Sequence, residues 1–175
     1  MRTAVVYADG SCPGRGCGGW ASLLSASWLP APALNYGMIR NTTIWRCEFY
    51  GILDALHTLN ETCGKGQVNI EIVCDSEALV KSLNGEYKRA KASPELFQAY
   101  RDLVVGHVVT VTWSGRCSNF YMKLVDGIAY AATKVIAEKV TAVFEELGSE
   151  VSDIKHSDVI KSVKDLQHAR IQDKA

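Results

Sequence analysis

Two strand-like runs that are each followed by an aspartate place the strongest constraint on the fold. Residues 3–8 form a short apolar, β-branched run, which is typical of a strand buried on both faces, and Asp9 comes next in the chain. Residues 68–74 are also rich in strand-forming side chains, and Asp75 comes next. Between the runs, apolar residues recur at helical spacing over 44–62, with Thr43 as a candidate N-cap. If the two strands are neighbours in one sheet, Asp9 and Asp75 meet at its carboxyl end.

The remaining pattern predicts a mixed sheet covered by helices. Further strands are expected over 20–29, 34–40 and 108–113, and further helices over 76–83, 94–104 and 120–147. Three strands come first and strands then alternate with helices, which favours an α/β fold. A chain of 175 residues fits one domain, which we expect to span 1–148, followed by a part-helical tail over 149–175.

Composition limits the functions that can be assigned without a specific site. The chain carries 19 Lys plus Arg and 19 Asp plus Glu, so its formal net charge of zero gives no support for general polyanion binding. The sequence starts without an apolar signal segment, and its six scattered cysteines lack a second metal-binding pair. These features favour reduced thiols in a cytoplasmic protein. No apolar run approaches the roughly 18 residues of a membrane span.

Four acidic residues are candidates for metal chemistry: Asp9 and Asp75 at strand ends, Glu48 in the first predicted helix and Asp126 in the long helix that follows the last strand. Clustered carboxylates raise one another's pKa unless a cation neutralises them, and oxygen ligands favour Mg²⁺ or Mn²⁺ over zinc. Taken singly, each has a structural alternative. Asp75 could cap the following helix, and Asp126 could lie on a solvated helix face.

Four segments in order resemble the type 1 ribonuclease H family. The first hairpin reads VVYADGSCPGRGCGGWASLL, the first helix TTIWRCEFYGILDAL, the fourth strand IEIVCDSEALVKSL, and the last loop and helix VTVTWSGRCSNFYMKLVDGIAYAA. The resemblance covers roughly residues 3–135. It implies a ribonuclease H-like fold, which is a five-stranded mixed sheet of three antiparallel strands and then parallel strands, with helices on both faces.

The resemblance also implies an activity. It is that of an endoribonuclease that cuts the RNA strand of RNA/DNA hybrids with two Mg²⁺ ions, or Mn²⁺ as a substitute, leaving 3′-hydroxyl and 5′-phosphate ends. Asp9 would bridge the ions, Glu48 and Asp75 would hold the leaving-group ion, and Asp126 the ion that carries the attacking water. Two divalent ions would raise the formal charge from zero to +4. Residues expected to contact the substrate are Gly10, Ser11, Cys12, Asn41, Thr43, Trp45, Ser76, Lys88 and Arg89.

The sequence departs from the family pattern at three places. Arg116 stands where many members carry a loop His. Arginine stays protonated near neutral pH and cannot shuttle protons, so we expect a catalytic role in phosphate contact or product release; the alternative is a solvated loop arginine. Ile44 and Trp45 replace polar residues that read RNA 2′-hydroxyls, and Trp45 either stacks on the substrate or belongs to the core. The basic protrusion is short, and no hybrid-binding domain is expected before residue 3.

Two other functions remain open on the same fold. One is a nucleic-acid-binding or scaffold domain with little turnover, against which the retention of four acids argues. The other is a nuclease for another structured nucleic acid, such as a junction resolvase or a proofreading exonuclease. Asp9-Gly10-Ser11 disfavours the exonuclease, which usually begins with Asp-x-Glu. The neutral tail over 149–175 is expected to dock on the domain, on a partner or on a second copy.

Overall fold

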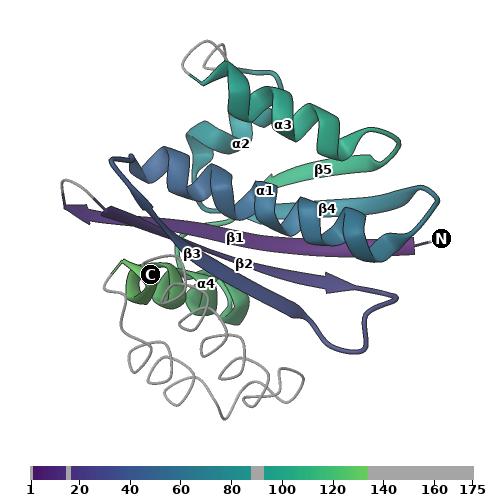
Figure 1. Ribbon diagram of the computed structural model, residues 1–175, viewed down its shortest axis with the longest axis horizontal. Helices are drawn as coiled ribbons and strands as arrows, with labels where there is room; N and C mark the ends of the chain where they lie inside the picture. The colour runs from purple at the N-terminus through teal and green to yellow at the C-terminus, as the bar shows by residue number, and fades with distance from the viewer. Residues whose placement is uncertain (1, 15–16, 88–92, 134–175) are drawn as a thin grey trace, which may run out of the picture.

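The computed structural model describes residues 2–14, 17–87 and 93–133 (Figure 1). Lys88, Arg89, the end of the predicted helix over 120–147 and the tail over 149–175 lie outside the described residues. The elements run in the predicted order: β1 (Arg2–Gly14), β2 (Cys17–Ala26), β3 (Ala33–Arg40), α1 (Ile44–Cys63), β4 (Val68–Cys74), α2 (Glu77–Leu83), α3 (Pro94–Val104), β5 (Val108–Trp113) and α4 (Phe120–Ala132).

The five strands form one mixed sheet in the order β3-β2-β1-β4-β5. The pairs β1–β2 and β2–β3 are antiparallel, whereas β1–β4 and β4–β5 are parallel. Ala8 pairs with Cys74 in the last row shared by β1 and β4, so the two predicted strands are neighbours and their pairing ends at this row. The expected ribonuclease H-like architecture is confirmed.

Helices cover both faces of the sheet, with α1, α2 and α3 on one face and α4 on the other (Figure 1). Alternation along β1 explains this sandwich, because Ala4, Val6 and Ala8 pack under α1 while Val5 and Tyr7 pack toward α4. β1 is therefore covered on two sides, as its apolar run predicts. β4 is buried mainly on the α1 side, and on its other face Val73 is buried but Glu71 is exposed. Among the described residues, no helix is long and apolar enough to cross a membrane.

The first hairpin corrects two predicted boundaries. β1 continues past Ala8 to Gly14, and β2 begins at Cys17 and ends at Ala26, three residues before the predicted end at Leu29. Gly18 and Gly19, which precede the predicted strand over 20–29, lie inside β2. A Cβ added at Gly19 would contact the Ala129 carbonyl and lie 2.9 Å from the Thr133 amide nitrogen, so this glycine lets α4 approach the sheet closely.

Candidate active site

Asp9 and Asp75 are brought together by the register of the two central strands. Asp75 follows Cys74 directly, and Asp9 follows Ala8, the residue paired with Cys74. The sequence predicted that β1 ends at Asp9, and this is wrong: Asp9 lies within β1, opposite Ala21 of β2. Only the pairing of β1 with β4 ends there, so Asp9 stands where β1 continues without β4.

Glu48 reaches the same place because α1 crosses β1 at a glycine. A Cβ added at Gly10 would contact the backbone nitrogen of Glu48 and lie 2.8 Å from the Cys47 carbonyl carbon. Any larger residue at Gly10 would push the helix away from the strand. The register of α1 is set at its start, where the Thr43 side chain accepts a hydrogen bond of 3.3 Å from the Arg46 backbone N–H.

The three carboxylates form a compact and poorly solvated cluster. One oxygen from each of Asp9, Glu48 and Asp75 lies within 4.8 Å of the others, and Asp9 and Glu48 are only 3% and 8% exposed. The Gly10 backbone N–H donates to Asp9 Oδ1 at 2.6 Å. Ser76 hydrogen-bonds the Glu48 side chain, and Asp75 hydrogen-bonds Asp9. Ser76, not Asp75, is the N-cap residue of α2, so capping does not explain Asp75.

Burial and mutual repulsion raise the pKa of all three acids. Desolvation and the nearby Asp75 charge raise the pKa of Asp9 to about 8, partly offset by the Gly10 hydrogen bond. Desolvation raises the pKa of Glu48 to about 7, against the hydrogen bond from Ser76. Desolvation also raises the pKa of Asp75, although the Arg116 charge acts in the opposite direction. Such perturbed acids at the end of a sheet are typical of functional sites.

This cluster fits a hard divalent cation. Its ligands are carboxylate oxygens only, which suit Mg²⁺ or Mn²⁺, and a cation would offset the repulsion that raises their pKa values. Asp9, Glu48 and Asp75 could hold such an ion directly. Cys74 lies next to the cluster, but burial raises the pKa of its thiol well above the ordinary value, so it is a poor thiolate ligand.

Asp126 lies near this cluster but is not one of its three members. It is carried by α4, and its charge contributes to the raised pKa values of Asp9 and Asp75. Its carboxylate pairs with Arg116, whose Nη2 donates to Asp126 Oδ1 at 3.1 Å. The Asp126 side chain is 30% exposed, so it does not lie on a fully solvated helix face. The Arg116 side chain is 77% exposed, but it is held in an ion pair and is not simply a solvated loop arginine.

The described residues that are expected to contact substrate lie in β1, before and within α1, and at the start of α2. Ser76 hydrogen-bonds Glu48, Thr43 caps α1, and Cys12 Sγ lies 3.7 Å from the Thr42 carbonyl oxygen. Asn41 is exposed and adopts a left-handed conformation with φ of 51°. Trp45 packs against Phe49 and Phe97 at centroid distances of 5.3 and 6.0 Å, which favours the core alternative for this side chain.

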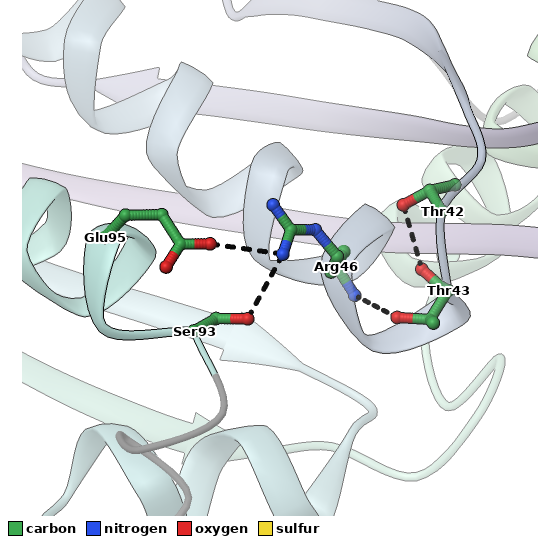
Figure 2. Close-up of polar contacts among 5 residues, drawn as sticks. All are labelled: Thr42, Thr43, Arg46, Ser93 and Glu95. Atoms are coloured by element: carbon green, nitrogen blue, oxygen red, sulfur yellow. Dashed lines mark hydrogen bonds and ion pairs between the residues drawn. The ribbon is translucent and has the colours of Figure 1, made fainter.

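Two supporting contacts were not anticipated from the sequence. Figure 2 shows Arg46 reaching from α1 to the start of α3, where its Nη1 donates to Ser93 Oγ at 3.3 Å and to Glu95 Oε1 at 3.1 Å. At the end of β5, Trp113 Nε1 donates to the Asp75 carbonyl oxygen at 3.1 Å and fixes the backbone next to a cluster residue. The Trp113 contact depends on its pairing with Cys74, which sequence pattern alone does not reveal.

Comparison with known proteins places this geometry in a known fold. No family model matches the chain. A ribonuclease H from Methylorubrum extorquens (strain PA1) is 40% identical over 85 residues, which are 47% of this chain and only 33% of that relative. Thus the match spans a third of the curated relative's length.

Solved structures extend the comparison over most of the chain. The N-terminal ribonuclease H domain of Rv2228c from Mycobacterium tuberculosis matches with a TM-score of 0.64 at 21% identity, over 79% of this chain and 98% of the other. RNase H1 from Halobacterium salinarum NRC-1 matches with a TM-score of 0.62 at 22% identity, over 77% and 99%. LC11-RNase H1 in complex with an RNA/DNA hybrid matches with a TM-score of 0.62 at 17% identity, over 75% and 96%. The chain therefore has the ribonuclease H fold, and its similarity to the type 1 ribonuclease H family is confirmed.

Proposed function

We propose that this chain is a divalent-metal-dependent endoribonuclease that hydrolyses the RNA strand of RNA/DNA hybrids. The observation that carries the proposal is the cluster of Asp9, Glu48 and Asp75, with oxygens within 4.8 Å of one another where the pairing of β1 with β4 ends. The sequence match to a ribonuclease H supports this activity, and the hybrid bound to LC11-RNase H1 supports the substrate.

The metal ligands in this proposal are Asp9, Glu48 and Asp75, with Asp126 as the fourth carboxylate. Two Mg²⁺ ions, or Mn²⁺ in their place, would orient a water for attack on the phosphodiester and stabilise the leaving oxygen. The chain's own contribution is to hold Asp9 of β1, Glu48 of α1 and Asp75 after β4 together, with Asp126 of α4 nearby. The chain must also lose the protons that burial retains on Asp9 and Glu48. The products would carry 3′-hydroxyl and 5′-phosphate ends.

Substrate contacts are assigned to the surfaces next to this cluster. Gly10, Ser11 and Cys12 continue β1 beyond Asp9, while Asn41 and Thr43 precede α1. Arg116 is mostly exposed beside Asp126 and is suited to contact a phosphate oxygen. Lys88 and Arg89 belong to the short basic segment, whose contribution should weaken as salt rises.

The decisive experiment offers four labelled substrates to the same protein: an RNA/DNA hybrid, duplex RNA, duplex DNA and a four-way junction. Each is incubated with Mg²⁺, Mn²⁺ or EDTA, and the ends of the products are determined. We expect cleavage of only the RNA strand of the hybrid, and only with a metal ion. Asp9→Asn and Asp75→Asn should abolish it with the fold intact. Binding of the hybrid without cleavage under all conditions would instead favour a binding domain, and cleavage of the junction a different nuclease.

The domain division and the cellular setting also remain proposals. We place the catalytic domain in 1–148 and assign 149–175 to contact with a partner or a second copy; light scattering of the chain with and without 149–175 tests the second assignment. All six cysteines are free, which supports a cytoplasmic, reducing setting.

A further inference from the structure

The fourth carboxylate of the proposed site is paired with a cation that the chain itself supplies. Arg116 lies in the loop between β5 and α4, ten residues before Asp126, and its Nη2 is 3.1 Å from Asp126 Oδ1. The loop is held at its base by the Ser114 backbone N–H, which donates to the Cys74 carbonyl at 3.0 Å, and by a contact between the Ser114 and Ser118 hydroxyls. The loop therefore holds Arg116 where its guanidinium reaches Asp126.

Asp126 lies outside the compact group that the other three acids form. Asp9, Glu48 and Asp75 have oxygens within 4.8 Å of one another, whereas Asp126 does not belong to that group of described residues. It is nevertheless close enough for its charge to act on Asp9 and Asp75, and the Arg116 charge acts on the same two residues. In this arrangement, Arg116 balances the negative charge of Asp126.

We infer that Arg116 and a divalent cation compete for Asp126, so that the ion pair must weaken or open when Asp126 becomes a metal ligand. This inference rests on the proposed metal-dependent function. A carboxylate has a second oxygen, but a guanidinium held beside a divalent ion would be repelled by it. Binding of the ion therefore releases Arg116, and its N–H donors become available to a phosphate oxygen. The order of events follows: the ion binds first and Arg116 then turns to the substrate.

The test measures metal binding without any nucleic acid, so that it does not depend on turnover. Mn²⁺ is titrated into the wild-type chain and into Arg116→Gln, with calorimetry for affinity and electron paramagnetic resonance for free Mn²⁺. Since an exposed ion pair contributes little, loss of the competitor should tighten the binding that depends on Asp126 by about two- to fivefold. Lys123→Gln is the matched control, because it removes a positive charge from the exposed surface of α4 without touching the ion pair, and it should change affinity less.

A double-mutant cycle separates competition from a general charge effect. In an Asp126→Asn background, Arg116→Gln should no longer tighten Mn²⁺ binding. An equal gain in both backgrounds, or no gain in wild type, overturns the inference. If Mn²⁺ binds and Asp9→Asn abolishes that binding while Arg116→Gln changes nothing, the inference fails and the metal site stands. If wild type binds no Mn²⁺ at all, the metal site and the inference fail together.

Discussion

Replacing Asp9 by Asn should stabilise the metal-free protein while it abolishes metal-dependent cleavage. Asp9 is 3% exposed and lies among other carboxylates, so its ionised form is disfavoured in the folded state. Asparagine has nearly the same shape, and its carbonyl oxygen can still accept the hydrogen bond that Gly10 donates to Asp9 Oδ1. Its amide group can donate to a neighbouring carboxylate, which Asp9 cannot do when ionised.

The size of the effect follows from the raised pKa. A change in the pKa of Asp9 from 3.8 to about 8 corresponds to at most about 6 kcal/mol at high pH. Relaxation around the charge and sharing of protons with Asp75 reduce this figure, and we expect about 2 kcal/mol in practice. For a chain of this length, that gain would raise the melting temperature by about 4–8 °C.

The raised pKa of Asp9 also fixes how the stability difference between Asp9→Asn and wild type should change with pH. Between an ordinary pKa of 3.8 and one of about 8, the folded protein binds more protons at Asp9 than the unfolded chain does. The free energy of unfolding of wild type therefore falls as pH rises through this window, and Asn removes this contribution. Urea unfolding in EDTA, followed by circular dichroism from pH 5 to pH 8.5, should show the advantage of Asp9→Asn growing with pH.

A control variant isolates burial from simple loss of charge. Asp102 is an exposed carboxylate on α3 that accepts a hydrogen bond from Gln98 at 2.7 Å, and Asp102→Asn should show no such growth. If Asp9→Asn unfolds at the same urea concentration as wild type, or a lower one, at pH 8 and the difference does not vary with pH, the argument from repulsion is wrong.

Three further predictions follow from the same structure. Cleavage with Mg²⁺ should rise as pH passes from 6 to about 8, because Glu48 and Asp9, with pKa values of about 7 and 8, must lose protons to bind a cation; pH–rate profiles at limiting Mg²⁺ test this, and a flat profile contradicts it. Gly19→Ala should lower the free energy of unfolding by about 1–3 kcal/mol, since the added Cβ meets α4, and unchanged urea stability would refute that close approach. Arg46→Ala should lower the free energy of unfolding by about 0.5 kcal/mol, because it removes the partly exposed ion pair with Glu95. Urea unfolding of this variant and of Arg46→Lys measures the difference.

The fold was predictable where sequence periodicity reports burial directly. The run over 3–8 is packed on both faces of the sheet, and the run over 68–74 is buried mainly on the face under α1. The apolar spacing over 44–62 matches α1 within one residue at its end. The first hairpin was less predictable because glycine occurs both in turns and at positions in a strand where a helix approaches closely. Gly18 and Gly19 look like turn residues, but the structure uses them where a side chain would collide with α1 and α4. Only the tertiary packing distinguishes these uses.

The candidate site was predictable in composition but not in geometry. Asp9 and Asp75 each follow a predicted strand, which indicates a shared edge once the strands are neighbours. The register confirms that they come together, although Asp9 lies within β1 and only the β1–β4 pairing ends there. The sequence does not reveal that Asp126 stands apart from the other three acids, because its position depends on the approach of α4 and on a loop arginine. The Trp113 contact with Asp75 is likewise a consequence of pairing between β4 and β5.

The unequal pairing of β1 leaves backbone groups that could contact a nucleic acid even where Ile44 and Trp45 replace polar side chains. β1 pairs with β2 as far as Gly14 but with β4 only as far as Ala8, so the edge of β1 beyond Asp9 presents peptide groups where a neighbouring strand has ended. A peptide N–H or carbonyl is the same whichever residue carries it, and such groups can contact sugar hydroxyls without any particular side chain. An alanine scan leaves these groups intact and would overlook them. Proline at Ser11 or at Cys12 deletes one peptide N–H of this segment, which alanine does not do, and tests it independently of Ile44 and Trp45.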